Sequence, residues 1–501
     1  MVYLIGAGPG DFGLTTIKAL ESIKKADCII YDRLANKMLL EYAKEGAEVI
    51  YVGKKGGSHI LPQSEINNLI VRKARQGKVV ARLKGGDPFI FGRGGEEALV
   101  LAEEGLPFEV VSGVTSPIAA PTYAGIPLTH RDYSSTVAFI TGHEDPDKKG
   151  TRVAWDKIST GAGTLVFLMG TKNLSRNVKK LMENGRAPDT PVAVIRWGTR
   201  PEQETVTGTL KDIVAKAGDI KPPTVMVVGE VVRLRERLNW FETRPLFGKR
   251  VLITRTKEQA GEFSDILRGY GAEPIEYPTI EIGPPDSWKQ LDKALNNIEQ
   301  YNWIIFTSVN GVRFFVKRLK AVGKDIRILK GIKICTIGPR TAKGVEDLGI
   351  NVDLLPERYI AEAIIDDLGK EEIKDRRFLL PRAMKAREVL PEEIERYGGK
   401  IDVVTVYKTT RPERGIAKIR GLLRKQAVDV VTFTSSSTVT NFVEGFEKGE
   451  AQELLSGIDV ACIGPVTAGT ARSLGIETAF MPEEYTIPAL VEEMVNYFQR
   501  K

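Results

Sequence analysis

The sequence predicts an α/β protein with more than one domain. Short apolar runs that end in glycine or a polar residue alternate with segments of helical spacing, which is typical of a mainly parallel sheet covered by helices. The chain has 501 residues, roughly two to four times the usual domain length, so a single core is not expected.

Composition restricts the class of protein. With 42% of residues in the AVILMFWYC set and 27% charged, the chain is neither largely disordered nor collagen-like. The formal net charge of +7 is compatible with nucleic acid, acidic lipid or a polyanionic small molecule as partner. Charge alone therefore leaves these three classes open.

Cysteine and histidine spacing indicates neither a disulfide framework nor a metal site. The three cysteines lie far apart, and the three histidines show no spacing typical of metal ligands. No apolar stretch approaches the roughly 18 residues that cross a bilayer, and the start MVYLIGAGPGD has no basic region typical of a signal peptide. We expect a cytoplasmic protein without metal that does not span a membrane.

The sequence of the first half predicts four buried strands. They are the apolar runs at 2–6, 28–32, 49–53 and 79–85, with helical spacing between them, as at 14–26 and 64–76. Ligands of such sheets collect at the carboxyl ends of the strands. The loops that follow these runs are therefore the expected place for a site.

A domain boundary is expected near Pro245, inside a charge-dense run at 231–250 that precedes a new strand. Beyond it the chain repeats itself. LITR ending at Arg255 recurs as LLPR ending at Arg382, and FTSVNGV from Phe306 recurs as FTSSSTV from Phe433, each 127 residues later. The repeat predicts two α/β lobes with similar loops around a ligand, although two units that share only turn chemistry remain an alternative.

The loop GAGPGD at 6–11 follows the first strand. The dinucleotide fingerprint GxGxxG needs glycine where this chain has Asp11, and Pro9 removes an amide that a phosphate would use. A structural turn without a ligand therefore remains open. Asp32 follows the second strand, where it could bind a ribose, cap a helix or take part in catalysis.

The stretch RLKGGDPFIFGRGGEE at 82–97 is the most distinctive in the chain. Its five glycines permit backbone geometry that other residues would strain. Asp87 supplies one carboxylate, and Phe89 and Phe91 supply an apolar wall. Such a loop could hold a flat, uncharged ring beside a cation, and a merely structural loop is the alternative.

Further motifs occur in order with these two: YDR at 31–33, VGKK at 52–55, GVTS, AGIPLTHRDY and LMGTKNL. Together the motifs resemble uroporphyrinogen-III C-methyltransferase over residues 1 to about 240. The resemblance implies a methyltransferase domain at 1–244 with the tetrapyrrole (class III) methyltransferase fold. In that fold two α/β subdomains bind S-adenosylmethionine between them. Asp32 and Lys54 would be proton acceptor and donor. The implied cofactor-binding residues are Pro9, Gly85, Gly86, Asp87, Ile90, Thr115, Ser116, Met169 and Gly198.

The second half, 245–501, resembles uroporphyrinogen-III synthase through VLITR, FTSVNGV, IGPRTA, VVTVYKT, FTSSS and IGPVTA. The resemblance implies a two-lobed α/β fold in which one lobe is inserted within the other. Lobe 1 would comprise about 246–280 and 412–501, and lobe 2 about 281–411. The lobe boundaries would then cut across the 127-residue repeat.

Together the two resemblances imply a bifunctional enzyme of tetrapyrrole biosynthesis. It would cyclise hydroxymethylbilane to uroporphyrinogen III with inversion of the last ring. It would then methylate C2 and C7 to give precorrin-2, which leads to sirohaem and cobalamin. Tyr407 is the best candidate to assist loss of the substrate hydroxyl.

Both substrates are octacarboxylates, which fits the basic net charge. We expect arginines and hydroxyl-rich loops to hold their carboxylates. The expected substrate-binding residues are Arg33, Arg93, Arg131, Arg255, Ser308, Asn310, Thr341, Arg382, Ser435, Ser436, Ser437 and Thr467.

The resemblance also suggests a homodimer formed through the methyltransferase half, and no nucleic acid partner is expected. Two alternatives remain. One is an NAD(P)-dependent oxidoreductase that uses GAGPGD and Asp32. The other is a methyltransferase fused to a non-catalytic two-lobed ligand sensor, because the second half lacks a strong acid/base constellation.

Overall fold

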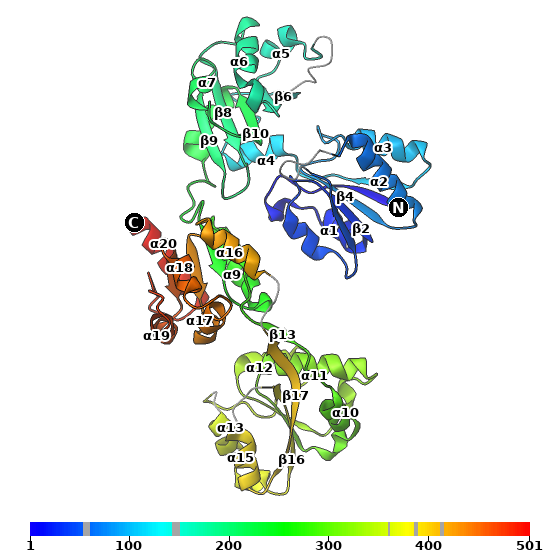
Figure 1. The fold of residues 1–501 in the computed structure, drawn as a ribbon, viewed down its shortest axis with the longest axis vertical. Helices are drawn as coiled ribbons and strands as arrows, with labels where there is room; N and C mark the ends of the chain where they lie inside the picture. The colour runs from blue at the N-terminus through cyan, green and yellow to red at the C-terminus, as the bar shows by residue number, and fades with distance from the viewer. Residues whose placement is uncertain (54–60, 143–150, 359–360, 385–388, 411–414) are drawn as a thin grey trace. The chain divides into compact units, whose positions relative to one another are not determined.

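The computed structural model describes residues 1–53, 61–142, 151–358, 361–384, 389–410 and 415–501 (Figure 1). Its internal contacts divide the chain into two units. The N-terminal unit comprises Met1–Lys249 with Leu267–Glu273, and the C-terminal unit comprises Arg250–Ile266 with Pro274–Lys501. None of the described helices is long and apolar enough to cross a membrane.

The N-terminal unit begins with a fully parallel five-stranded sheet, in the order β3-β2-β4-β1-β5. Its four leading strands match the four predicted runs to within one or two residues. The strands are β1 (Val2–Gly6), β2 (Cys28–Tyr31), β3 (Glu48–Tyr51), β4 (Val80–Lys84) and β5 (Phe108–Val111). The helical segments are η1 (Phe12–Leu14), α1 (Ile17–Lys25), η2 (Lys37–Tyr42), α2 (Gln63–Arg75) and α3 (Gly94–Glu103).

Helices cover both faces of this first sheet. On one face, Ile66 of α2 and Leu101 of α3 pack in a cluster with Val80 of β4. On the other face, Ile23 of α1 packs with Leu83 of β4. Alternate residues of β4 therefore face different helices, and the parallel arrangement places all five strand ends at one edge of the sheet.

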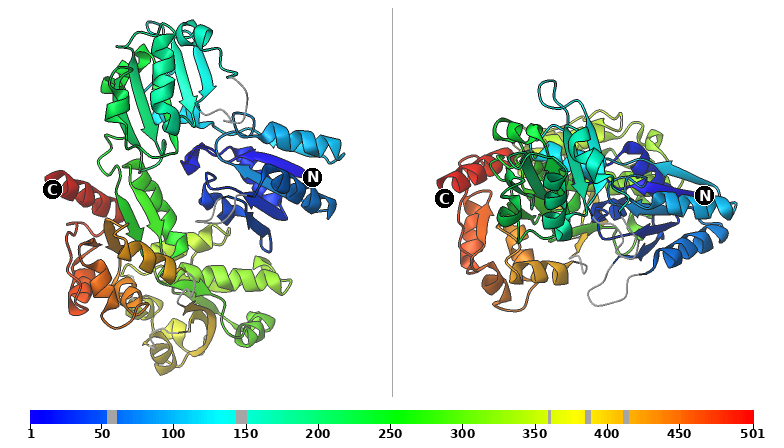
Figure 2. Two further views of the ribbon diagram at one scale, coloured as in Figure 1. Left: turned by 45° about the horizontal axis from the view of Figure 1, so that its top comes forward. Right: turned by 90° about the horizontal axis from the view of Figure 1, so that it is seen from above.

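A second sheet follows in the same unit, in the order β6-β7-β10-β8-β9, with its strands side by side in Figure 2. It is mixed rather than mainly parallel, because β10 runs antiparallel to β7 and β8. The strands are β6 (Val137–Thr141), β7 (Thr164–Leu168), β8 (Pro191–Arg196), β9 (Glu204–Thr209) and β10 (Thr224–Val228). The helical segments are α4 (Ser116–Tyr123), α5 (Trp155–Gly161), η3 (Thr171–Asn173), α6 (Leu174–Glu183), α7 (Ile213–Lys216), η4 (Glu230–Leu234) and α8 (Arg235–Leu238).

The charge-dense run at 231–250 is folded onto α4 rather than extended. The ring of Phe241 lies 4.8 Å from that of Tyr123 and 5.3 Å from that of Phe247, between centroids. Trp240 Nε1 donates a hydrogen bond to the carbonyl oxygen of Thr122 at 3.0 Å. The division between the units falls after Lys249, so the run up to that residue belongs to the N-terminal unit.

The C-terminal unit contains two sheets, of order β12-β11-β18-β19 and β13-β17-β16-β14-β15. Among the strand pairs described in this unit, β13 and β17 are antiparallel and the other pairs are parallel. The strands are β11 (Arg250–Ile253), β12 (Glu273–Glu276), β13 (Glu281–Gly283), β14 (Trp303–Phe306), β15 (Lys333–Thr336), β16 (Arg377–Ala383), β17 (Lys400–Thr410), β18 (Val430–Phe433) and β19 (Asp459–Cys462).

Helices flank both sheets of this unit. They are α9 (Lys257–Gly269), α10 (Lys289–Asn296), η5 (Ile298–Gln300), α11 (Val309–Ala321), η6 (Ile326–Leu329), α12 (Pro339–Glu346), α13 (Ala361–Leu368), α14 (Lys370–Ile373), α15 (Val389–Arg396), α16 (Ile416–Arg424), α17 (Ser436–Val443), α18 (Glu450–Leu455), α19 (Pro465–Ser473) and α20 (Ile487–Arg500).

The strands follow the sequence repeat. β16, β17 and β18 each begin 127 residues after β11, β12 and β14, and β19 begins 126 residues after β15. The first copy of the repeat nevertheless places β11 and β12 in one sheet and β14 and β15 in the other, and the second copy is divided in the same way. Of these eight matched strands, each sheet therefore takes two from each copy, and β13 is an additional strand of the second sheet.

Candidate functional site

Three loops meet at the carboxyl ends of β1, β4 and β5. The amide nitrogens of Gly8 and Gly86 each donate a hydrogen bond to the other's carbonyl oxygen, at 3.2 and 2.7 Å. A Cβ atom on Gly6 would lie 2.5 Å from the backbone nitrogen of Gly113, closer than real side chains approach. Glycine is therefore required where the backbones cross.

A cavity of about 100 Å³ lies beside these loops, with the end of β8 and the start of β10 completing its wall. It brings together five of the predicted cofactor residues. These are Pro9, Gly85, Gly86, Ser116 and Gly198. Ligand pockets are usually about 300 Å³ or larger, so a nucleoside-sized ligand needs the open space next to the cavity as well.

The other four predicted cofactor residues do not line this cavity. Ile90 and Met169 are exposed, at 39% and 52% of their surface, and Thr115 is buried at the start of α4. Asp87 is also buried. Its carboxylate accepts hydrogen bonds from the amides of Phe89 at 2.7 Å and Gly113 at 3.0 Å. Asp87 therefore ties the loop after β4 to the loop after β5.

Sequence reasoning missed the run WGTRP at 197–201 as part of this wall. Trp197 and Arg200 line the cavity, and the guanidinium carbon of Arg200 lies 4.9 Å from the Trp197 ring centroid. Trp197 and Thr199, on either side of Gly198, have positive φ angles of 48° and 75°. Such backbone strain in residues other than glycine is common at functional sites. The other lining residues not predicted are Gly8, Leu34, Ala120, Ile195, Pro223, Thr224 and Val225.

Asp32 lies just past β2 with its side chain partly exposed. One carboxylate oxygen accepts a hydrogen bond from the Leu34 amide at 3.2 Å, and the other lies 3.4 Å from Nη2 of Arg82. Lys54, its predicted partner, lies outside the described residues.

The predicted substrate-binding arginines of this unit, Arg33, Arg93 and Arg131, are exposed. Arg93 makes a two-point ion pair with Glu96, at 2.9 and 2.6 Å. Within the described part of the unit, the structure shows no contact among the three.

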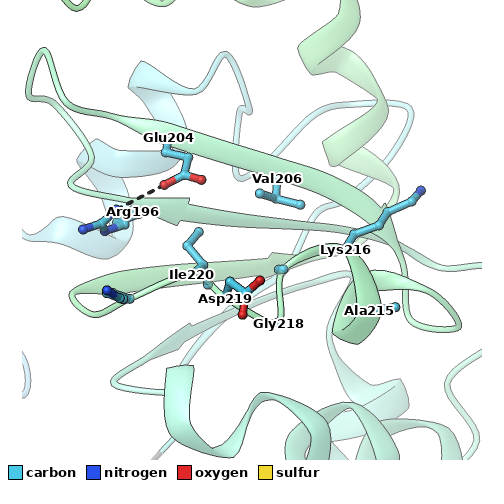
Figure 3. Close-up of a pocket in the computed structure, with 10 residues that line it drawn as sticks. Arg196, Glu204, Val206, Ala215, Lys216, Gly218, Asp219 and Ile220 are labelled. Carbon is cyan, nitrogen blue, oxygen red and sulfur yellow. Dashed lines mark hydrogen bonds and ion pairs between the residues drawn. The ribbon is translucent and has the colours of Figure 1, made fainter.

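A larger hollow of about 280 Å³ lies at the edge of the second sheet, around β9 and the end of α7 (Figure 3). Its lining combines apolar side chains, such as Val206 and Ile220, with charged ones. Arg196 pairs with Glu204 at 3.3 Å, and Lys216 pairs with Asp212 at 2.7 Å. Because no loop of the first sheet lines the hollow, whereas five predicted cofactor residues line the smaller cavity, we place the site at the smaller cavity.

In the C-terminal unit, Tyr407 and Ser308 are brought together. The hydroxyl of Tyr407 in β17 lies 3.1 Å from Oγ of Ser308, and its ring stacks on Phe314 with centroids 6.0 Å apart. Ser308 Oγ also accepts a hydrogen bond from the amide of Gly311 at 3.0 Å, as the N-cap of α11. Asn310 lies within the first turn of that helix, and Thr341 is buried within the first turn of α12.

A second group of hydroxyls repeats this arrangement. Ser435 caps α17 as Ser308 caps α11, and the hydroxyl of Ser437 lies 3.0 Å from that of Ser435. Thr470 Oγ1 donates to Ser436 Oγ at 2.8 Å, and Thr467 is buried at the start of α19.

Two arginines occupy matching positions near the ends of β11 and β16, the first strands of the two copies of the repeat. Arg255 follows β11, where burial lowers its pKa, and Arg382 is buried in β16. All the predicted residues of this unit therefore lie at or near the carboxyl ends of parallel strands. Among the described residues, no group of three His, Cys, Asp or Glu side chains could hold a metal ion.

Comparison with known proteins gives two family matches. Residues 1–214 match the model of tetrapyrrole (corrin/porphyrin) methylases, and residues 261–492 match that of uroporphyrinogen-III synthase HemD. The porphyrin biosynthesis protein HemD of Ruminiclostridium josui is 38% identical across 99% of this chain and 97% of its own length. An S-adenosyl-L-methionine-dependent uroporphyrinogen III methyltransferase of Methanosarcina barkeri is 53% identical across 47% of this chain and 94% of its own.

Two solved structures from Thermus thermophilus are also similar. A uroporphyrin III C-methyl transferase is 39% identical with a TM-score of 0.41, over 46% of this chain and 99% of its own. A mutant uroporphyrinogen III synthase is 17% identical with a TM-score of 0.37, over 50% of this chain and 100% of its own.

The two hydrogen bonds of Asp87 predict that its removal destabilises the N-terminal unit. In Asp87→Ala, the amides of Phe89 and Gly113 lose their acceptor, which costs about 1–3 kcal/mol of unfolding free energy. Urea unfolding followed by circular dichroism measures the change. The control is Asp132→Ala, whose carboxylate is largely exposed. Equal stability of the two variants would contradict a structural role for Asp87.

Proposed function

Because the chain belongs to the family of porphyrin biosynthesis proteins that join a tetrapyrrole methylase to a uroporphyrinogen-III synthase, we propose that it forms uroporphyrinogen III and then methylates it. The chain is a bifunctional enzyme of tetrapyrrole biosynthesis that uses S-adenosylmethionine. The finer proposal is the product precorrin-2, made by two transfers to C2 and C7. The observation that carries the proposed methyl transfer is the glycine-lined cavity at the strand ends of the N-terminal unit.

Together with the open space next to it, the cavity would accommodate the nucleoside end of this cofactor. Gly85, Gly86 and Gly198 let the backbone approach a flat ring, and Ile195 and Val225 supply apolar walls. The bound cofactor would supply a methyl group on a positively charged sulfur. The loops would hold the cofactor beside the substrate, and this alignment of two reactants would supply most of the rate increase. Asp32 accepts the proton that the methylated ring releases.

In the C-terminal unit, Tyr407 donates a proton to the departing hydroxyl of the bilane under this proposal. Its neighbour Ser308 and its stacking on Phe314 fix the direction of the phenol. The hydroxyl-rich loops and Arg255 and Arg382 hold carboxylates. Closure without an enzyme gives the uninverted isomer, so control of the bilane's conformation matters more than chemical activation.

The family assignment argues against the alternatives of an NAD(P)-dependent oxidoreductase and a non-catalytic sensor. Association of two copies through the N-terminal unit is part of the proposal, as is action in the cytoplasm. The three buried, unpaired cysteines are compatible with a reducing compartment.

The double activity is tested on the purified chain with hydroxymethylbilane. Without S-adenosylmethionine we expect uroporphyrinogen III, and with it a dimethylated product, both identified by chromatography and mass spectrometry. Uroporphyrinogen I alone, at the rate of the reaction without protein, would reject the synthase assignment. Uroporphyrinogen III that stays unmethylated would reject the methyltransferase assignment.

Gly86→Val tests the cofactor cavity. The new side chain would fill space at the cavity wall, so affinity for S-adenosylhomocysteine should fall by about tenfold or more, while synthase activity persists. Gly77→Val is the matched control. Gly77 has a φ of +78°, close to the +70° of Gly86, so it carries the same backbone strain, but it faces open space. Calorimetry that shows equal affinity in the two folded variants would exclude this cavity as the site.

Tyr407→Phe tests the synthase half. It removes the hydroxyl next to Ser308 but keeps the ring on Phe314, so isomer III should form about tenfold or more slowly while isomer I rises. Ser308→Ala should slow isomer III less, because it keeps the Tyr407 hydroxyl that donates the proton and removes only one of several hydroxyls that hold the bilane. Chromatography of the oxidised porphyrins gives the ratio of isomers. Complete loss of isomer III in a folded Ser308→Ala variant would assign the essential role to Ser308 instead.

A further inference from the structure

Three charged side chains are buried beneath α2 and α3 in the N-terminal unit. Arg82 and Lys84 on β4 and Glu97 on α3 are 2%, 4% and 1% exposed. Arg82 and Lys84 alternate with Leu83, so they share the sheet face of Val80, against the helices. Burial of ions is costly unless they are paired, and neither the cofactor cavity nor the synthase half uses these groups.

Glu97 is the centre of this buried group. Its Oε1 accepts hydrogen bonds from Arg82 Nε at 3.1 Å, Lys84 Nζ at 2.8 Å and Gln63 Nε2 at 3.0 Å. Burial, together with the neighbouring charge of Arg82, lowers the pKa of Lys84. A carboxylate with three donors on one oxygen holds those donors in place.

The guanidinium of Arg82 has a different partner at each nitrogen. Nε donates to Glu97, Nη1 donates to the Leu83 carbonyl oxygen at 3.0 Å, and Nη2 reaches Oδ2 of Asp32 at 3.4 Å. Because the guanidinium is planar, the hydrogen bonds at Nε and Nη1 fix its orientation. Its third nitrogen therefore presents a fixed donor to Asp32.

Burial separates the roles of the two partners. The Asp32 side chain is 30% exposed, and that of Arg82 only 3%. A tetrapyrrole can therefore reach Asp32 but not Arg82. The second oxygen of Asp32 accepts from the Leu34 amide, so the carboxylate is held at both oxygens.

We propose that Arg82, anchored by Glu97, is a positioning residue that fixes the carboxylate of Asp32 in the direction needed for proton removal during methyl transfer. The inference rests on the proposed role of Asp32. A misplacement of about 1 Å in a reacting group can cost roughly a hundredfold in rate. Arg82 is therefore expected to affect turnover without affecting the binding of the cofactor, whose cavity it does not line.

The first test is Arg82→Lys, which keeps the charge but cannot contact Glu97, Leu83 and Asp32 together. We expect the kcat of methylation to fall about tenfold or more, with unchanged calorimetric affinity for S-adenosylhomocysteine. Arg75→Lys, at an exposed ion pair with Glu104 on the same subdomain, is the control and should behave as wild type. Wild-type kcat in a folded Arg82→Lys variant would overturn the proposal.

A double-mutant cycle distinguishes positioning from general destabilisation. Asp32→Asn should lower the kcat of methylation by about a hundredfold. Adding Arg82→Lys to the Asp32→Asn variant should lower kcat no further. Losses that multiply would show that Arg82 acts independently of Asp32, and would reject the proposal. If Asp32→Asn alone kept wild-type turnover, the proposed function of Asp32 would fail first, and the two failures are thereby distinguished.

Glu97→Gln provides a second variant in case Arg82→Lys does not fold. The amide keeps the shape of Glu97 but removes the charge that anchors Arg82 and Lys84. We expect a smaller loss of kcat that also disappears in the Asp32→Asn background. A loss of the same size in both backgrounds would contradict an action through Asp32.

Discussion

The cofactor cavity depends on the absence of side chains where three loops of the first sheet cross. A Cβ on Gly6 would lie 2.5 Å from the nitrogen of Gly113 and 2.7 Å from the carbonyl oxygen of Gly86. Because the three glycines lie at the ends of β1, β5 and β4, their contact brings the ends of these strands together. The paired bonds between Gly8 and Gly86 and the bond from the Gly113 amide to Asp87 exist only because the backbones approach so closely.

The two units treat charge in different ways. The N-terminal unit buries ions next to Asp32 and neutralises them with one another through Glu97. The C-terminal unit presents hydroxyls, such as Ser308 and Ser435, at helix starts. A fixed direction suits the removal of one proton from one carbon. Hydroxyls, which can donate or accept, suit a long, flexible bilane with many carboxylates.

The repeat in the C-terminal unit shows how similar segments can be divided between sheets. β11 and β16 begin 127 residues apart and occupy the same place in their sheets, yet each pairs with a strand of the other copy, β18 and β14. As a result, Arg255 and Arg382 recur at equivalent strand ends. Each lobe is completed by both copies, so neither copy of the repeat can form a full sheet by itself.

The sequence by itself determined many features of this protein, through its apolar periodicity and the order of its motifs. They located the first four strands, the repeat, the family and five of the residues that line the cavity. These features are local, since a buried strand or a tight glycine turn is set by neighbouring residues. Only the tertiary structure decided that Asp87 ties two loops together, that Trp197 and Arg200 close the cavity, and that the second sheet is mixed. Arg82 gave no local signal as the partner of Asp32, because the two are 50 residues apart and meet only when β2 pairs with β4 and α3 packs over them.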